Sequence, residues 1–343
     1  MNRIDRLVRP NVRALVPYSS ARDEYEGREG IFLDANESPF GPLNRYPDPR
    51  QRVLRVAISN LKGIAEDNIF LGNGSDEVID LCYRIFCNPG TDRAVIFPPT
   101  YGMYGVSAAI NDVEVIKVPL DENFGIDIPA ITPLLADERI KLIFICSPNN
   151  PTGNCMETDR IEFIIRNFSG IVVIDEAYAD FSGRPSFIEK TGMYDNLIVM
   201  QTFSKAMGMA AARIGMAFAS PDILKYFFRV KPPYNISTLN QEAAMERLSD
   251  FKPVTIQTET LVTERKRLSE KLQALAVVEK VWPSDANFLL VRVKDPDAVY
   301  NILINKNIIV RNRSREISGC LRITAGTRSE NDRLLDELSK IKL

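Results

Sequence analysis

Short apolar runs alternate with amphipathic segments between about residues 70 and 220, and this alternation limits the possible folds more than any other feature. The runs are rich in β-branched residues and bounded by Pro, Gly or Asp, which is typical of buried strands. They cover residues 68–71, 93–97, 141–146, 170–175 and 196–201. Helical patterns lie between them at 75–86 and 157–168, and Ser75 is the expected N-cap of the first. We therefore predict an α/β fold with a mostly parallel sheet that helices cover on both faces.

The pattern changes after about residue 236. Helical segments are expected at 241–248, 255–276 and 329–341, and strands at 288–293, 307–310 and 320–324. This mixture predicts a smaller α+β domain, joined near the Pro-Pro-Tyr sequence at 232–234. Prolines interrupt the N-terminal part too often for a regular domain. We therefore expect an N-terminal segment at 1–40 that packs on both domains, a large domain at 41–235 and a small domain at 236–343.

The composition excludes several classes of protein. No apolar run approaches the roughly 20 residues of a membrane helix. The 43 basic and 45 acidic side chains leave no positive excess that would favour nucleic acid as a partner. Histidine is absent, which excludes a Ser-His-Asp or Cys-His centre, an imidazole base and any His-ligated metal, and we expect no metal. Five scattered cysteines and a start without an apolar stretch predict reduced thiols in a cytoplasmic protein.

Polar clusters follow the expected strands at their carboxyl ends, where open parallel sheets bind ligands. Residues 147–153 (SPNNPTG) hold the Asn150 amide between two prolines, although the same sequence is consistent with a turn that binds nothing. Asp175 ends an apolar strand. A carboxylate buried there needs a partner, whereas an exposed strand end needs none.

The third cluster contains Thr202, Ser204, Lys205 and Arg213. Small and apolar residues follow Lys205, and such surroundings lower a lysine pKa and make the amine a nucleophile, whereas most lysines are solvated charges. The glycine-rich loop at 72–76 precedes a helix, so its amides can bind a phosphate together with Arg213. A reactive lysine, a phosphate site and a carboxylate for a pyridinium nitrogen together specify pyridoxal phosphate.

Residues 147–153, IDEAY at 174–178 and TFSK at 202–205 with Arg213 occur in the order typical of fold-type I aminotransferases, the group that includes aspartate aminotransferase. The chain is most similar to the histidinol-phosphate aminotransferase branch. This similarity is carried by LVPYSSAR (15–22), LDANESPFGP (33–42), NRYPDP (44–49), PPTYGMY (98–104) and CLRITAGTRSEN (320–331). It implies a fold-type I transferase, with a large coenzyme-binding domain and a smaller C-terminal domain.

The resemblance also implies roles for individual residues. Lys205 would bind the coenzyme as a Schiff base and then move the proton between the substrate Cα and the coenzyme. Asp175 would pair with the protonated ring nitrogen, while Asn150 and Tyr178 would bind the 3′-oxygen and Tyr101 would stack on the ring. The phosphate contacts would be Gly74, Ser75, Asp76, Thr202, Ser204 and Arg213, with Tyr46 from the partner subunit of a homodimer. The substrate contacts would be Tyr18, Asn36, Arg311 and Arg322.

The activity implied is the exchange of an amino group between L-histidinol phosphate and 2-oxoglutarate in histidine biosynthesis. The reaction would be ping-pong through pyridoxamine phosphate, in the direction that consumes imidazole acetol phosphate and L-glutamate. An aromatic or broad-range aminotransferase and a threonine-phosphate decarboxylase share these motifs and stay open. A regulator domain that senses the coenzyme is a third alternative, which the near-neutral charge and the lack of a helix-turn-helix region disfavour.

Overall fold

The computed structural model describes residues 2–18, 21, 25 and 30–342, and its larger part is built around a seven-stranded sheet. The strand order is β1-β7-β6-β5-β4-β2-β3. The strands are β1 (Ile69–Asn73), β2 (Arg93–Ile96), β3 (Glu114–Lys117), β4 (Ile140–Cys146), β5 (Ile171–Asp175), β6 (Leu197–Thr202) and β7 (Ile214–Ala219). Strand β7 is antiparallel to β6 and β1, whereas the pairings among β2 to β6 are parallel. The prediction of a mostly parallel sheet is confirmed.

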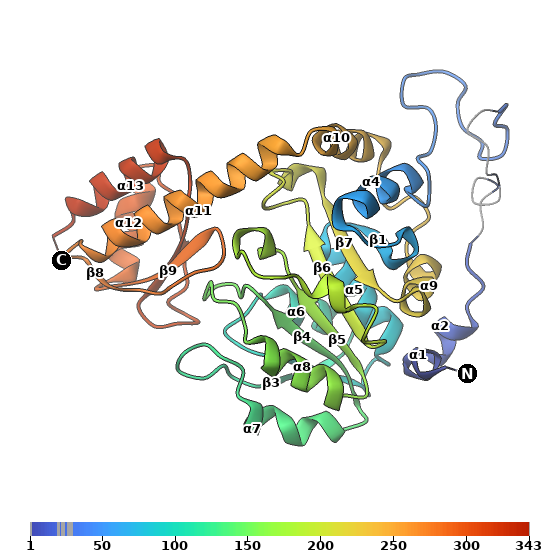
Figure 1. Ribbon diagram of the computed structural model, residues 1–343, viewed down its shortest axis with the longest axis horizontal. Helices are drawn as coiled ribbons and strands as arrows, with labels where there is room; N and C mark the ends of the chain where they lie inside the picture. Colours follow the sequence, from blue (N-terminus) through green and yellow to red (C-terminus); the bar gives the residue numbers. More distant parts are fainter. Residues whose placement is uncertain (1, 19–20, 22–24, 26–29, 343) are drawn as a thin grey trace.

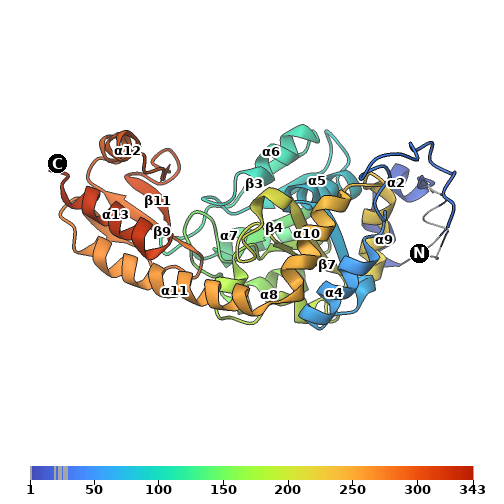
Figure 2. The same ribbon diagram turned by 90° about the horizontal axis from the view of Figure 1, so that it is seen from above.

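Helices cover both faces of this sheet, with α5 and α6 on one side and α4 and α8 on the other (Figures 1 and 2). Each face of the sheet has its own hydrophobic core, and alternate residues of β4 pack into one or the other. Leu142 and Phe144 pack in the core that contains α5, whereas Ile143 and Ile145 pack in the core that contains α8. The first layer contains α1 (Arg3–Leu7), α2 (Pro10–Ala14), α5 (Ser75–Phe86), α6 (Met103–Ile110) and α9 (Pro221–Val230). The second contains α4 (Arg52–Lys62), α7 (Ile128–Ile131), α8 (Thr158–Asn167) and α10 (Thr238–Ser249). Short 3₁₀ turns are η1 (Glu66–Asn68), η2 (Thr132–Ala136), η3 (Ala179–Phe181), η4 (Phe187–Lys190) and η5 (Ala210–Ala212).

A second, antiparallel sheet of order β10-β11-β9-β8 lies at one end of the molecule (Figure 2). Its elements are β8 (Val278–Val281), β9 (Phe288–Val293), α12 (Pro296–Asn305), β10 (Arg311–Asn312), β11 (Cys320–Thr324) and α13 (Arg328–Ser339). The long helix α11 (Lys252–Gln273) joins the two parts, because Val254 packs in the core of the large sheet while Leu268 and Leu272 pack in that of the small one. Within the described residues, no helix has the length and apolarity needed to cross a membrane.

The described part of the N-terminal segment packs against the large part of the molecule. Ile4, Val8 and Val12 are buried in the same core as α5 and α9. Arg3 pairs with Asp195, and Nη1 and Oδ1 are 2.7 Å apart. The limits 1–40, 41–235 and 236–343 stay a prediction, and part of the LVPYSSAR motif lies outside the described residues.

Two predictions of local structure are wrong. Residues 307–310 do not form a strand, because Asn307 has a left-handed backbone (φ 57°) and the Ile308 amide bonds back to the Leu303 carbonyl. The short strand β10 begins only at Arg311. Ser75 is the first residue of α5 rather than its N-cap, since Gly74 occupies that position with a φ of 79° that favours glycine.

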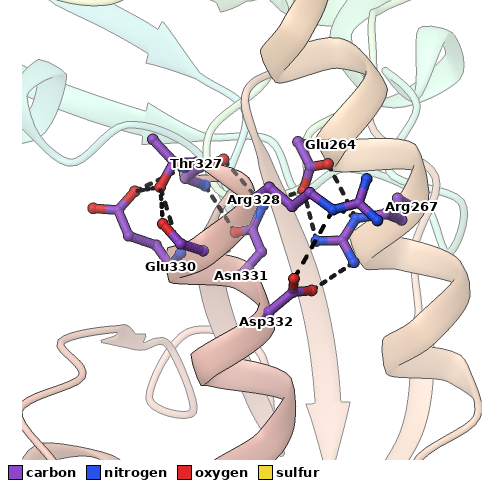
Figure 3. A network of polar contacts seen from close by, with 9 residues as sticks. Glu264, Arg267, Thr327, Arg328, Glu330, Asn331 and Asp332 are labelled. Carbon is purple, nitrogen blue, oxygen red and sulfur yellow. Dashed lines mark hydrogen bonds and ion pairs between the residues drawn. The ribbon is translucent and has the colours of Figure 1, made fainter.

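A polar network fixes the turn that follows β11 to helix α11 (Figure 3). The buried Asn331 donates from Nδ2 to Glu264 Oε2 and to the Gly326 carbonyl, both at 3.0 Å. Its Oδ1 accepts from the Gly326 amide, also at 3.0 Å. Arg267 donates to Glu264 and to Asp332, each at 2.7 Å. The network thereby holds the end of the strand that carries Arg322.

Replacing Glu264 by glutamine is expected to lower the free energy of unfolding by about 1–3 kcal/mol at pH 7, because a buried charge-assisted hydrogen bond is lost. The hydrogen bonds from Arg267 lower the pKa of Glu264. The charged contacts therefore stabilise the fold above the unfolded pKa and lose that effect as the pH falls through the lowered folded value. Urea unfolding of the unchanged protein and of Glu264→Gln, at pH 7 and in acid, measures the difference in their free energy of unfolding. A difference in unfolding free energy that does not shrink in acid contradicts the assignment. Asp336→Asn, in the exposed pair with Lys340, is the control and should leave the unfolding free energy essentially unchanged.

Candidate active site

The polar loops predicted from the sequence meet at one edge of the large sheet. Cys146, Asp175 and Met200 are aligned across β4, β5 and β6, so the loops that follow these strands leave the sheet together. The Ser147 amide donates to the Asp175 carbonyl at 2.9 Å, which fixes the first loop to the second. The edge is formed by carboxyl ends of parallel strands, the expected location of a ligand site.

Asp175 is a buried carboxylate whose hydrogen-bond donors are neutral. Its side chain accepts from the Tyr104 hydroxyl at 2.7 Å and from the Ala177 amide at 3.0 Å. Burial raises its pKa, and the two hydrogen bonds oppose this only in part. No cation within the described residues donates a hydrogen bond to it. The site therefore offers a strong electrostatic attraction for a cation placed beside Asp175.

Lys205 is half-buried in the loop between β6 and β7. Its Nζ lies 5.5 Å from the centroid of the Tyr178 ring, and that ring packs edge-on against Phe288. Burial is the main cause that lowers the pKa of Lys205, and the positive charge of Arg322 lowers it further. The amine is thus biased toward its neutral form, which is the nucleophilic one.

The start of α5 and the β6–β7 loop form a candidate anion site. A Cβ on Gly215 would lie 2.3 Å from the Ser75 nitrogen, so only glycine lets the start of the helix approach β7 this closely. Arg213 lies against Gly74, and its Nη2 is 3.4 Å from Asp76 Oδ2. Free amides at a helix start and a guanidinium suit a phosphate group.

Hydroxyl groups border this anion site. Asp76 also accepts from the Tyr101 hydroxyl at 3.0 Å. Thr202 accepts from the Ser204 amide at 3.1 Å and donates to the Ile214 carbonyl. The predicted phosphate contacts at 74–76, 202–204 and Arg213 therefore lie close together on two adjacent loops.

Arg322 on β11 extends from the small sheet into the same region. Its Nη1 donates to Asn150 Oδ1 at 2.5 Å, and Asn150 Nδ2 is 3.4 Å from the Tyr178 hydroxyl. Its Nε is buried and has no hydrogen-bond partner among the described residues. An unpaired buried guanidinium nitrogen beside a lysine marks a position where an anionic group of a ligand would be bound. Arg311 lies opposite Arg322 in the β10–β11 pair, on the same face of the sheet.

Three predicted site residues lie elsewhere in this chain. Tyr18 lines a surface cavity of about 850 Å³ beside α5 and α9. Asn36 and Tyr46 line another, of about 400 Å³, and the Tyr46 ring stacks on Tyr234 with centroids 4.4 Å apart. Neither cavity is lined by Lys205 or Asp175.

The sequence analysis missed three residues of the site. Tyr104, the second tyrosine of PPTYGMY, is buried and binds Asp175. Asn149 is also buried and donates to the Pro99 carbonyl at 2.9 Å, which ties that motif to the loop at 147–153. Arg313 reaches Asn150, with Nη2 3.5 Å from Oδ1. The repeated tyrosine and the spacing of Arg311 and Arg313 were the available signals.

The family model of aminotransferase class I and II matches residues 29–338. The chain therefore belongs to the class I and II aminotransferases. It is 53% identical to the histidinol-phosphate aminotransferase of Parabacteroides distasonis, over 98% of each chain. This similarity places it in the histidinol-phosphate aminotransferase family.

Solved structures share the fold of this chain. The histidinol-phosphate aminotransferase of Clostridium acetobutylicum superposes with a TM-score of 0.79 at 26% identity, over 87% of this chain and 90% of that one. The enzyme of Sinorhizobium meliloti, solved in complex with pyridoxal-5′-phosphate, has a TM-score of 0.79 at 24% identity, over 89% of each chain. The fold class predicted from the sequence is thus confirmed, and the protein is an enzyme of the transaminase type.

Proposed function

We propose that this enzyme exchanges the amino group between L-histidinol phosphate and 2-oxoglutarate in histidine biosynthesis, using pyridoxal phosphate. One observation carries the chemistry: a lysine with a lowered pKa lies at the same sheet edge as a buried aspartate whose donors are neutral. The name of the relative from Parabacteroides distasonis supports the choice of substrate. The amino donor and the keto acid are small molecules, as in other members of the family.

The residues present fit pyridoxal phosphate. Asp175 would hold the protonated ring nitrogen, since its carboxylate has no cationic hydrogen-bond partner within the described chain. Gly74, Ser75 and Arg213 would bind the phosphate, because the close approach of Gly74 to Gly215 brings free amides beside the guanidinium. Asn150 and Tyr178 would bind the 3′-oxygen, and Tyr101 would lie against the ring. When bound, this coenzyme supplies an electron sink that weakens the bond between the substrate Cα and its hydrogen.

Lys205 is the residue we assign to proton transfer. Its amine, whose pKa is lowered by burial, would take the proton from the substrate Cα and deliver it to C4′ of the coenzyme. No imidazole competes for this role, because the chain has no histidine. Tyr178 packs against Phe288 and faces Lys205, so it would limit the directions from which the amine can reach the substrate.

Arg322 would bind the anionic end of the substrate. Within the part of the chain that the structure describes, its Nε lacks a hydrogen-bond partner, and the amide oxygen of Asn150 accepts from its Nη1. A phosphate or carboxylate would accept two parallel hydrogen bonds from this guanidinium. Arg311, Tyr18 and Asn36 stay the further substrate contacts that the resemblance implies.

A visible absorption spectrum of the coenzyme-loaded protein tests the proposal. We expect a yellow protein that loses its colour when L-histidinol phosphate is added without a keto acid, and regains it with 2-oxoglutarate. Loss of colour with phenylalanine alone would favour an aromatic aminotransferase. Release of carbon dioxide from threonine phosphate would favour the decarboxylase, and a protein that stays colourless with added coenzyme would contradict the chemistry altogether.

We also propose a cytoplasmic homodimer in which Tyr46 reaches the coenzyme phosphate of the partner subunit. The side chains of Ile31, Leu33 and Phe40 are 91%, 89% and 82% exposed. Apolar side chains this exposed on one segment favour burial against another surface. All five cysteines are unpaired, which suits a reducing compartment. Sedimentation equilibrium tests the assembly, since a mass equal to one chain would contradict it.

Replacing Tyr104 by phenylalanine is expected to weaken coenzyme binding about tenfold, because Asp175 loses a hydrogen bond that stabilises its charge. The pKa of the Asp175 carboxyl, already raised by burial, should rise further. Fluorescence titration of the coenzyme-free protein with pyridoxal phosphate measures the change.

Tyr83→Phe is the matched control for the Tyr104 variant. Tyr83 is equally buried and donates its hydroxyl to the Tyr104 carbonyl at 2.9 Å, so this variant also loses a buried hydroxyl in the same cluster but leaves Asp175 bonded. Equal dissociation constants for the two variants would show that Tyr104 acts only through packing.

A further inference from the structure

Arg313 brings a second guanidinium to the amide that Arg322 binds. It lies in the loop between β10 and β11, and only 12% of its side chain is exposed. Its Nη2 is 3.5 Å from Asn150 Oδ1, the same oxygen that accepts from Arg322 Nη1 at 2.5 Å. Two cations from the small sheet thus converge on one neutral acceptor next to Tyr178.

The contacts of Arg313 within the chain do not balance its charge at this place. Its Nη1 donates to Glu316 Oε1 at 2.7 Å, but the Glu316 side chain is 42% exposed, and exposed pairs of this kind contribute little. Like that of Arg322, its Nε is buried and no residue of the described ranges accepts a hydrogen bond from it. Arg313 and Arg311 both lower the pKa of Arg322, after the larger effect of burial, so positive charge is concentrated here.

We propose that Arg313 is a specificity-determining residue that, with Arg322, receives a doubly charged phosphate ester in preference to a singly charged carboxylate. Two guanidinium groups with free donors match the two charges and three oxygens of a phosphate monoester. A carboxylate has two oxygens and one charge, so one arginine satisfies it. This inference rests on the proposed function, because the phosphate of the substrate is the ligand assigned to the pair.

Glu316 has the opposite effect on the same site. Its carboxylate occupies one nitrogen of Arg313 and offsets part of the positive charge that an incoming phosphate meets. Removing that charge should therefore improve phosphate binding, while removing the charge of Arg313 should weaken it. A residue with a purely structural role would not give changes of opposite sign for the two partners of one ion pair.

The test measures competitive inhibition of the coenzyme-loaded enzyme by propyl phosphate and by butanoate. In Arg313→Gln we expect the inhibition constant of propyl phosphate to rise about tenfold or more, from the loss of a charged hydrogen bond, while that of butanoate changes less than about threefold. Glu316→Gln should lower the constant for propyl phosphate. Arg313→Lys, which keeps the charge but not the fork, should lie between Arg313→Gln and the unchanged enzyme.

The exposed Arg315 in the same loop provides the control, and Arg315→Gln should change neither constant. The proposal is overturned if Arg313→Gln matches Arg315→Gln, or if it weakens both inhibitors equally. The KM for L-histidinol phosphate should rise in Arg313→Gln with little change in kcat. The unchanged enzyme could fail to convert L-histidinol phosphate while Arg313→Gln still raises the inhibition constant of propyl phosphate more than that of butanoate. In that case the proposed substrate is wrong and the phosphate site stands.

Discussion

Replacing Lys205 by alanine is expected to lower kcat for transamination by at least about a thousandfold, because one side chain supplies both the covalent attachment and the proton transfer. Its pKa is lowered by burial and by the positive charge of Arg322, which favours the nucleophilic form of the amine. The coenzyme should still bind through contacts to Asp175 and Arg213, but without the yellow colour of the covalent form. Stopped-flow absorbance with L-histidinol phosphate measures the loss.

The control variants for Lys205 separate charge from reactivity. Lys205→Arg keeps a cation but removes the nucleophile, so it should be as inactive as Lys205→Ala. Lys225→Ala removes an exposed lysine that pairs with Asp222 on α9 and should leave turnover unchanged. Turnover by Lys205→Ala within about tenfold of the unchanged enzyme would contradict the proposed mechanism, since general acid–base catalysis alone contributes about 10²–10⁴.

Replacing Asp175 by asparagine is expected to lower kcat by about 10²–10³, because a neutral amide cannot hold a positive ring nitrogen in a buried site. The same change should not destabilise the coenzyme-free protein. Burial raises the pKa of Asp175, so its charged form costs stability once the pH exceeds the unfolded value, and asparagine removes that cost. We therefore expect equal or higher unfolding free energy at pH 7.

Two measurements on one protein sample test the Asp175 prediction: steady-state kinetics with saturating coenzyme, and urea unfolding without it. Asp222→Asn on the exposed start of α9 is the control for removal of a carboxylate. A large loss of stability together with the loss of activity would mean that Asp175 acts as a structural residue. Full activity in the variant would remove it from the site.

The sequence predicted the parallel part of the sheet well, because residues 142–146 and 171–174 are buried and form unbroken apolar runs. It did not predict β7, whose sequence IGMAFA contains glycine and alanine where the start of α5 packs. The run at 307–310 was misassigned because a left-handed turn at Asn307 takes its amides away from any ladder. Local apolar patterns carry no information about such close backbone contacts.

The site was predictable to the extent that its residues follow strand ends. Asp175 and Lys205 could be located in that way, whereas Tyr104 could not, since its hydroxyl reaches Asp175 from a helix 71 positions away in the sequence. Tyr18, Asn36 and Tyr46 line surface cavities that neither Lys205 nor Asp175 lines, so their predicted roles stay predictions.

Because β7 runs antiparallel to its neighbour β6, a short connection between the two strands carries Lys205 and Arg213. Both lie in the single loop that joins β6 to β7, and Thr202 is paired with Gly215 at its base. The strand register of one hairpin therefore positions both the proposed covalent anchor and the proposed phosphate-binding cation. A slip of one residue in that ladder would turn Gly215 away from the start of α5 and displace both groups at once. Insertions in this loop should thus be tolerated far less than insertions in the loops of the small sheet.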